Sequence, residues 1–343
     1  MRIALDVNGG DYGLEPNIDG ALKAAAELPH EIILVGREEQ IKKALSSRGY
    51  NALPDRISIV NATQEIAMDG EAVEEYRNNP DASMSVAAGL VHDGKADAFV
   101  SAGNSGAMMV AATFRMKRIK GVIRPAIAAL LPTSSTPSLL LDAGANMDCK
   151  PVNLLQFAVM GSMYMQTLLK IEKPTVGIFS IGEEECKGNL LVHETMPALK
   201  KLGLNFVGPV EGRDLPPGKI NVIVADGFVG NIALKLYEGT AKAVFSMLKE
   251  RIKSHFSYKI AALMLKKVFI SLKDKMSADI YGGAPLLGID GIAMVCHGSA
   301  NSRAIFNALR VSADLAASGM VEKVRARMEE LKPVFESLKQ ETK

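Results

Sequence analysis

The chain has 343 residues, of which 48% are hydrophobic and 23% are charged, with no Trp and a formal net charge of +2. This composition is typical of a soluble globular protein, long enough for one large α/β unit or two modest domains. The opening MRIALDVNGGD turns to Gly and Asp after a few apolar residues, too few for the core of a secretory signal, so we expect a cytoplasmic protein.

Apolar runs and turn residues alternate through the first half of the chain. We expect strands at 1–7, 31–35, 56–60 and 96–101, and helices at 16–27, 40–48, 69–77, 83–92 and 105–117. After Arg124 and Pro125, two apolar strands flank a short turn at 133–138. Strands joined so closely are antiparallel, so the sheet is expected to be mixed.

The second half repeats this alternation. A Met-rich helix is expected from Asn153 to about Lys170, then strands at 175–181, 205–207, 220–225 and 291–296 with helices between them, a helix at 302–317 and a charged helix at 321–343. Alternation of this kind predicts helices on both faces of a central sheet. We see no linker, so the whole chain, 1–343, is predicted to be a single α/β domain.

The segment 243–277 breaks the alternation, because it is helix-like throughout and adds no strand. From Lys242 to Lys275 it carries nine basic residues against two acidic ones, a net charge of +7 that leaves −5 for the rest of the chain. Its apolar centre, at about 15 residues, is too short and too charged to span a bilayer.

Three roles fit this basic segment. It could lie in the membrane interface, with Leu263, Phe269 and their apolar neighbours buried and Lys259, Lys266 and Lys267 facing anionic headgroups. An ordinary packed helix pair, for instance at a dimer interface, has the same composition. Recognition of an acidic partner protein fits the charge equally well.

Five loops built from Gly and Asn follow apolar strands and precede helices. They read VSAGNSGA (100–107), LLDAGANMD (140–148), SIGEEECKGN (180–189), VADGFVGN (224–231) and VCHGSAN (295–301). In an open parallel sheet such loops gather along one edge, where ligands bind, and amides at helix N-termini attract anions. Gly and Asn also favour turns and helix caps, so each loop alone has a purely structural reading.

Several side chains in these loops could handle a small anion or a developing negative charge. Lys187 is the one cation within them, although three neighbouring carboxylates also permit a local salt bridge. Asn104 and Asn231 can donate amide hydrogens to an oxyanion or cap helices. His297 could position a phosphate or relay a proton, and Ser101 and Ser105 flank a glycine turn where capping is their default role.

Common catalytic motifs are absent from the sequence. There is no Walker A motif, GxGxxG fingerprint or GxSxG elbow. Cys149, Cys186 and Cys296 show no CxxC spacing and the five His show no HExxH pattern, so neither a disulfide framework nor a metal is expected. Cys186 has no adjacent His that would favour an acyl-enzyme.

The loops and the opening turn together resemble the bacterial phosphate acyltransferase family, the acyl-ACP:phosphate transacylases. The similarity runs along nearly the whole chain, through DVNGGD (6–11), SAGNSGA, RPA (124–126), LDAGANMD, IGEEECKGN, DGFVGN, YGGAPLLG and CHGSAN. Three positions depart from the usual pattern: Asn8 replaces a Met, Ser105 a common Thr and Ala143 a common Leu. None of the three removes a group that the chemistry needs.

The resemblance implies a three-layer αβα sandwich with a mixed, mostly parallel sheet, like those of phosphate acetyltransferases and isocitrate/isopropylmalate dehydrogenases. It also implies a homodimer that works in the cytoplasm with peripheral membrane contact through 243–277, close to the downstream glycerol-3-phosphate acyltransferase. Acyl carrier protein and inorganic phosphate are the implied substrates. No cofactor, metal or nucleic acid is expected.

The resemblance also suggests roles for individual residues. Lys187 would hold phosphate or the oxyanion and Asn231 would polarise the carbonyl, while Asp6, Asp11 and Asp226 would order the loops. The phosphate and substrate pocket is predicted to comprise Gly9, Gly10, Asp11, Ser101, Gly103, Asn104, Ser105, Gly106, Asn146, Asp226 and His297.

Phosphate itself would attack the thioester carbonyl, so no activated Ser or Cys is required. Three rivals remain at this stage: a phosphate acetyltransferase acting on acyl-CoA, a non-catalytic membrane scaffold for lipid enzymes, and, from the fold alone, a dehydrogenase.

Overall fold

The computed structural model describes residues 1–341, and for residues 278 and 338–341 it describes the backbone alone. Eleven strands of this part form one sheet in the order β3-β2-β1-β4-β11-β10-β5-β6-β9-β7-β8. The strands are β1 (Arg2–Asp6), β2 (Glu31–Gly36), β3 (Ile57–Asn61), β4 (Ala98–Ser101), β5 (Ala126–Leu131), β6 (Ser138–Leu141), β7 (Thr175–Phe179), β8 (Asn205–Val210), β9 (Val222–Val224), β10 (Ala284–Leu287) and β11 (Ile292–Val295).

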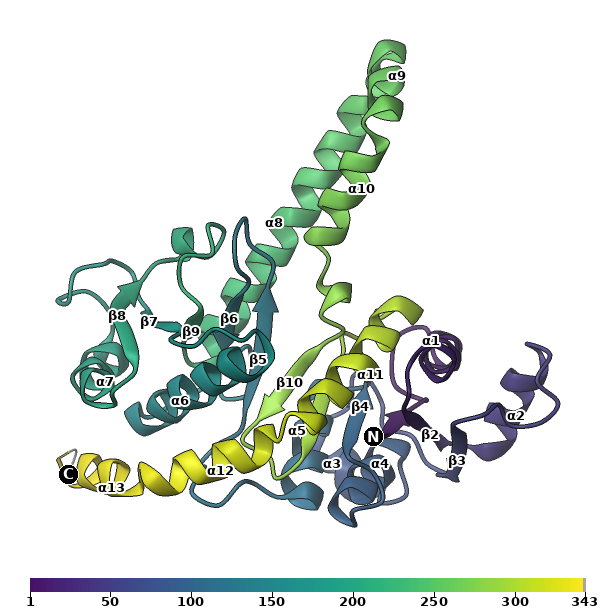
Figure 1. Ribbon diagram of the computed structural model, residues 1–343, viewed down its shortest axis with the longest axis horizontal. Helices are drawn as coiled ribbons and strands as arrows, with labels where there is room; N and C mark the ends of the chain where they lie inside the picture. Colours follow the sequence, from purple (N-terminus) through teal and green to yellow (C-terminus); the bar gives the residue numbers. More distant parts are fainter. Residues whose placement is uncertain (342–343) are drawn as a thin grey trace.

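Helices connect most of these strands (Figure 1). They are α1 (Leu14–Glu27), α2 (Glu38–Ser46), α3 (Ala72–Asn78), α4 (Ser83–His92), α5 (Ser105–Ala111), α6 (Pro151–Leu168), α7 (Leu190–Lys201), α8 (Gly227–Ser254), α9 (Phe256–Met264), α10 (Lys266–Lys275), α11 (Ser302–Ala317), α12 (Met320–Glu330) and α13 (Lys332–Glu341). Short turns of other helix types lie at Ala112–Met116, Gly212–Asp214 and Ala278–Ile280. The charged C-terminal helix expected to reach 343 is thus two helices, and 342–343 lie outside the described residues.

Alternate side chains of the strands pack into different helix layers. Ile3 and Leu5 of β1 lie in a core that α1, α11 and α6 share, whereas Ala4 faces the opposite side, with α4 and α5. In the other half of the sheet, Leu140 of β6 faces a third core that α8 helps to cover. Because side chains alternate along each strand, both faces of the sheet are apolar and helices cover each of them. The predicted αβα sandwich is confirmed.

Two strands in the middle of the sheet reverse its direction. β10 runs antiparallel to β11 and to β5, and β5 also runs antiparallel to β6. The predicted antiparallel β5–β6 pair is confirmed. β10 was not predicted, because Ala284–Leu287 is only four residues long and contains Pro285, which is unfavourable in most strands.

These reversals separate the Gly-Asn loops into two groups. β1, β4 and β11 are parallel to one another, and so are β6, β9 and β7, but the second group runs opposite to the first. Figure 1 shows the two groups on either side of β5 and β10. The expectation that the loops share one edge is therefore wrong. The loops after β1, β4 and β11 form one cluster, and those after β6, β7 and β9 form another.

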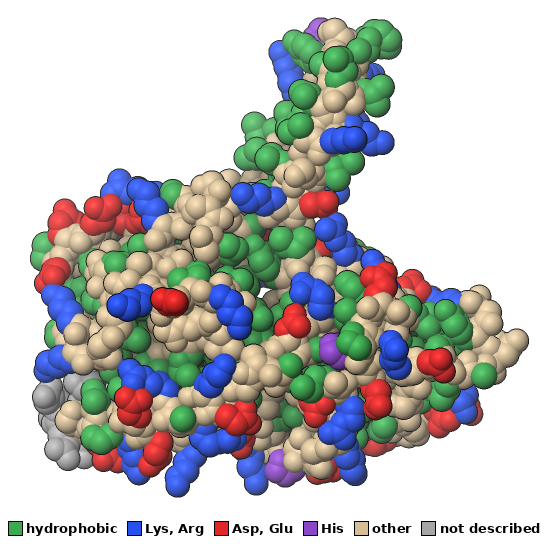
Figure 2. Space-filling model, in the orientation of Figure 1, with side chains coloured by type: hydrophobic (Ala, Val, Ile, Leu, Met, Phe, Trp, Pro, Cys, Tyr) green, Lys and Arg blue, Asp and Glu red, His purple; other side chains and the backbone are tan. Residues whose placement is uncertain are grey.

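The second half of α8 continues away from the sheet and pairs with α9 and α10 to form an arm (Figure 1). The sequence presents the helix after β9 and the basic segment as two units. In the structure, α8 is one continuous helix that includes the start of the basic segment, and α9 and α10 then bring the chain back along it. α9 and α10 contain no buried residue within 256–275. Large apolar side chains and Lys or Arg side chains are both displayed on the arm (Figure 2).

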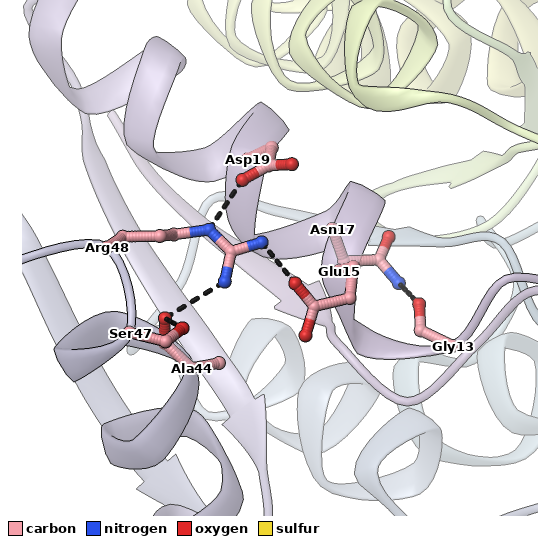
Figure 3. Close-up of polar contacts among 7 residues, drawn as sticks. All are labelled: Gly13, Glu15, Asn17, Asp19, Ala44, Ser47 and Arg48. Carbon is pink, nitrogen blue, oxygen red and sulfur yellow. Dashed lines mark hydrogen bonds and ion pairs between the residues drawn. The ribbon is translucent and has the colours of Figure 1, made fainter.

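Asn17 of α1 holds in place the turn at 7–13, between β1 and α1. Its buried Nδ2 donates hydrogen bonds to the carbonyls of Val7 at 3.0 Å, Gly9 at 2.8 Å and Gly13 at 3.2 Å. Nearby, Arg48, in the turn after α2, forms ion pairs with Glu15 and Asp19 of α1 (Figure 3). Both contacts tie α1 to its surroundings, but Asn17 is buried whereas Glu15 and Asp19 are exposed.

We expect Asn17→Ala to destabilise the protein by about 1–3 kcal/mol, because buried carbonyls lose their donor. Arg48→Met is the control and should cost at most about 1 kcal/mol, because ion pairs with exposed partners contribute little. Urea denaturation of both variants measures the difference. A larger loss for Arg48→Met than for Asn17→Ala would contradict the prediction.

Candidate active site

The first cluster surrounds the buried carboxylate of Asp6, at the end of β1. Asp6 accepts hydrogen bonds from Ser83 Oγ at 2.6 Å and Ser101 Oγ at 2.7 Å. A Cβ on Gly9 would lie 2.5 Å from the Gly103 nitrogen, so only glycine permits this close approach of the two turns. We call this group, with the turns at 8–11, 101–106 and 297–301, the Asp6 cluster.

Most predicted binding residues of the Asp6 cluster have structural contacts. Asn104 caps α5 through its Oδ1, and its Nδ2 donates to the carbonyls of Met68 and Gly70, both at 3.1 Å. The backbone N–H of Asp11 donates to the Gly298 carbonyl at 2.7 Å. Ser101 is fully buried on Asp6. The capping alternative therefore accounts for the contacts of Asn104, and its amide is already engaged.

The remaining predicted residues of the Asp6 cluster lie at its surface or in its packing. Ser105 is exposed at the start of α5, and Gly106 packs beside Ala72 of α3. Gly10 adopts φ 114°, which favours glycine. His297 is exposed, and its Nδ1 accepts the backbone N–H of Ser299 at 3.1 Å, which puts the proton of the neutral ring on Nε2.

The second cluster surrounds the buried carboxylate of Asp142, directly after β6. Its Oδ2 accepts the backbone N–H of Asn146 at 2.7 Å and its Oδ1 accepts that of Ile127 at 2.9 Å. The Asn146 side chain in turn donates to Asp142 and to the Pro125 carbonyl. Asn146, predicted to bind substrate, is thus buried and shapes the loop. We call the loops at 142–148, 180–189 and 225–231 the Asp142 cluster.

The start of α8 packs tightly on this loop. Asp226 caps the helix by accepting the Val229 N–H at 2.8 Å, and the Gly227 N–H donates to the Asn146 carbonyl at 2.7 Å. A Cβ on Gly144 would lie 3.4 Å from Cγ of Asn231, so the Asn231 side chain lies over the Asp142 loop. Asp226 therefore fixes the start of α8, and this packing positions Asn231.

Among the described residues, the side chains of Asn231 and Lys187 have no polar partner. Asn231 is half-buried, and within residues 1–341 its side chain makes no hydrogen bond. Of the carboxylates beside Lys187, Glu183 pairs with Arg213 at 3.2 Å and Glu185 with Lys200 at 2.6 Å. The exposed ammonium of Lys187 forms no ion pair with any residue that the structure describes, so the local salt bridge considered from the sequence does not form there.

The Asp142 cluster has the electrostatic features of an anion site. β7 and β9 are parallel neighbours, so the loops that carry Lys187 and Asn231 leave the sheet side by side. α7 and α8 both begin in these loops, and the N-termini of helices carry partial positive charge. Asn189 and Asp226 cap these two helices, so the groups left to hold a phosphate and stabilise an oxyanion are the Lys187 ammonium and the Asn231 amide.

Burial raises the pKa of Asp6 and of Asp142 above 3.8, because the effect of burial outweighs the hydrogen bonds that these carboxylates accept. A raised carboxyl pKa means that the folded protein retains a proton that the unfolded chain releases. This contribution to stability is fully present below pH 3.8 and is lost as the pH rises through the raised pKa values.

We therefore expect Asp142→Asn to flatten the pH dependence of stability, because it removes one of these titrating groups. The measurement is the urea midpoint of the variant and the parent protein between about pH 4 and about pH 7. Asp148→Asn, at an exposed carboxylate of the same loop, is the matched control. An Asp142→Asn profile parallel to that of the parent would contradict the prediction.

Several residues of the two clusters were not predicted from the sequence. Asp142 is part of the motif LDAGANMD, but no role was predicted for it. Ser83 was predicted only to lie in a helix. Ser180, directly after β7, is 9% exposed and its buried Oγ makes no hydrogen bond in the described part of the chain. A carboxylate directly after an apolar strand, as in LLDAG, is the pattern that could have indicated Asp142.

Comparison with known proteins identifies the relatives of this chain. A family model described as "Fatty acid synthesis protein" matches residues 1–323. A phosphate acyltransferase from Elusimicrobium minutum is 53% identical over 338 residues, which cover 98% of this chain and 99% of the relative. Another from Geotalea daltonii is 44% identical over 335 residues, covering 98% and 96%.

A solved structure supports the fold. A phosphotransacetylase from Streptococcus pyogenes superposes with a TM-score of 0.60 at 18% identity, covering 94% of each chain. At this identity the likeness concerns the fold alone, and it confirms the expected likeness to the fold of phosphate acetyltransferases.

The fold, the loops and the relatives together define an α/β acyltransferase. Within that class, the chain belongs to the phosphate acyltransferase family, whose reaction is acyl transfer to phosphate. The predicted family and enzyme class are confirmed.

Proposed function

We propose that this protein transfers a long-chain fatty acyl group from acyl carrier protein to inorganic phosphate, giving acyl phosphate for phosphatidic acid and phospholipid synthesis. The observation that carries the proposal is the pair of free donors, Lys187 and Asn231, on the neighbouring loops after β7 and β9. Asn231 lies over a loop that the buried Asp142 carboxylate holds in place.

In the proposed reaction a phosphate oxygen attacks the thioester carbonyl carbon. The C–O bond forms, the C–S bond breaks, and the thiolate leaves on the carrier. Lys187 holds the phosphate or the oxyanion, and Asn231 donates an amide hydrogen to the carbonyl oxygen as negative charge develops. A thiol with a pKa near about 8.5 leaves with little help from an acid, so positioning and charge stabilisation account for the catalysis.

A donor comparison tests this function. Purified protein, inorganic phosphate and palmitoyl acyl carrier protein should release thiol and form an acyl phosphate that hydroxylamine traps, whereas acetyl-CoA should be a poor donor. Preference for acetyl-CoA would instead favour the phosphate acetyltransferase alternative. No acyl phosphate from either donor would favour the scaffold alternative.

The arm is proposed to attach the protein, as a homodimer in the cytoplasm, to the membrane near the acyltransferase that consumes its product. Leu263 is 72% exposed and Met264 is 83% exposed, and Lys259, Lys266 and Lys267 are exposed beside them. Phe269 is half-buried, so it contributes less surface than expected. No helix within residues 1–341 is long and apolar enough to cross a bilayer, and this attachment needs none.

We expect Leu263→Glu/Met264→Glu to abolish sedimentation with anionic vesicles, because both side chains would carry charge into the membrane interface. Lys42→Glu/Lys43→Glu on α2 is the control, since these exposed lysines lie outside the arm. Vesicle sedimentation is the measurement. Undiminished pelleting of the arm variant would rule out these two side chains as anchors.

A further inference from the structure

A short loop far from the arm carries the second concentration of positive charge in the chain. Residues 115–124, here called the basic loop, contain Arg115, Lys117, Arg118, Lys120 and Arg124 and no Asp or Glu, a net charge of +5. All five side chains are exposed. None of them forms an ion pair with a carboxylate of residues 1–341. The loop therefore presents charge that no described side chain neutralises.

The basic loop is held rigidly. Met116, Ile119 and Val122, which alternate with the cations, are buried. The buried side chain of Gln156 in α6 clamps the loop: its Oε1 accepts the Ile123 N–H at 2.8 Å and its Nε2 donates to the Gly121 carbonyl at 2.8 Å. Because the backbone of the loop is already fixed, a partner that binds has only the side chains of these cations to order.

The loop borders a hollow of about 510 Å³ lined by Phe114, Lys117, Arg118 and Lys120, among others. The Phe114 ring is 65% exposed and stacks on Tyr76 with 6.0 Å between ring centroids. A concave surface with cations at its rim and one aromatic side chain matches the anatomy of a protein–protein interface.

The basic loop also leads directly to the Asp142 cluster. Arg124 Nη1 donates to the Asp148 carbonyl at 2.6 Å, and the next carbonyl, that of Pro125, accepts from Asn146 at 2.7 Å. The Arg124 end of the basic loop therefore touches the loop that shapes the Asp142 cluster.

We propose that the basic loop is the docking surface for an acidic protein, and specifically for the acyl carrier protein, an identification that rests on the proposed function. Charge complementarity fits this partner, because unneutralised cations steer an acidic surface towards the loop. A membrane fits less well. Within residues 113–124 Phe114 is the one exposed large hydrophobic side chain, whereas the arm offers many.

The test is Lys117→Glu/Lys120→Glu, which reverses two charges at the rim of the hollow. We expect the Kd for acyl-free carrier protein, measured by fluorescence anisotropy, to rise about tenfold or more, with a weaker dependence on salt. The ratio of kcat/KM for palmitoyl carrier protein to that for uncharged palmitoyl-pantetheine should fall by a similar factor. Lys42→Glu/Lys43→Glu on α2 makes the same change of charge elsewhere and should leave that ratio unchanged.

Three results would overturn the inference: an unchanged Kd for the loop variant, an equal rise in Kd for the α2 control, or loss of anionic vesicle binding with normal carrier binding. The last result would identify the loop as a membrane surface. Because acyl-free carrier protein undergoes no reaction, its Kd reports docking even if the protein makes no acyl phosphate. Failure of the inference and failure of the proposed function are therefore distinguishable.

Discussion

Lys187→Ala is expected to lower kcat for acyl phosphate formation by about 10²–10³-fold, because it removes one of the two donors proposed to act on the thioester and phosphate. Stability should change by less than about 0.5 kcal/mol, since Lys187 is exposed and forms no ion pair with a described residue. The measurements are steady-state kinetics with saturating phosphate and a urea midpoint. Lys187→Arg, which keeps the charge, should retain more activity than Lys187→Ala.

Lys200→Ala is the matched control for Lys187→Ala. Lys200 lies in α7, shortly after Lys187, and its ammonium is occupied by Glu185 at 2.6 Å. Removing this cation should leave kcat unchanged. Equal losses from both variants would show that overall positive charge, and not the free ammonium of Lys187, is what matters. A Lys187→Ala variant with normal turnover would remove this residue from the mechanism.

The same assay can measure the energetic coupling between Lys187 and Asn231. If both side chains stabilise one developing charge, the double variant should lose less activity than the product of the two single losses, because groups that act as a unit are not additive. Strict additivity would indicate that the two residues act on separate steps or separate ligands.

Gly230→Ala is expected to destabilise the protein by about 3 kcal/mol or more. A Cβ at this position in the first turn of α8 would lie 1.9 Å from the carbonyl oxygen of Asp142 and 3.0 Å from its carbonyl carbon. These are backbone atoms of a buried loop, so the clash can be relieved only by lifting α8 or by deforming the Asp142 cluster. Urea denaturation measures the loss, and activity should fall with it.

Gly239→Ala, in the same helix, is the control for Gly230→Ala. A Cβ on Gly239 meets nothing within 4 Å, so this substitution should stabilise the helix by at most about 1 kcal/mol. Opposite signs for two identical substitutions in one helix would isolate the packing of α8 on the Asp142 loop. Equal stability of both variants would mean that α8 is not seated there as described.

Most helices and strands could be predicted from local patterns. β1, β2 and β4 are apolar runs that end at Gly or polar turns, and α11 follows Asn301, which caps it by accepting the Ala304 N–H at 3.0 Å. Such information lies within a few residues of each element, so a single sequence contains it. β10 shows the limit of this approach, since four residues with a proline are defined as a strand only by the neighbours β11 and β5.

The candidate site could be predicted residue by residue but not as an arrangement. Lys187 and Asn231 were identified from their loops, and these loops leave the same edge of the sheet because β7 and β9 are parallel neighbours. Asn104 was expected to cradle phosphate, yet its amide donates to carbonyls more than thirty residues earlier in the chain. No local pattern reports such a contact.

The sequence by itself determined the family, the αβα layers and the chemical groups that the loops carry, because motifs, strand period and helix caps are local properties of the chain. Only the tertiary structure decided which loops meet. Two antiparallel strands, β10 and β5, reverse the sheet and send the Asp6 and Asp142 clusters to different edges. The direction of a strand relative to its neighbours depends on the whole path of the chain. The same path leaves the side chains of Lys187 and Asn231 without a described polar partner, whereas it brings the Asn104 amide to the carbonyls of Met68 and Gly70.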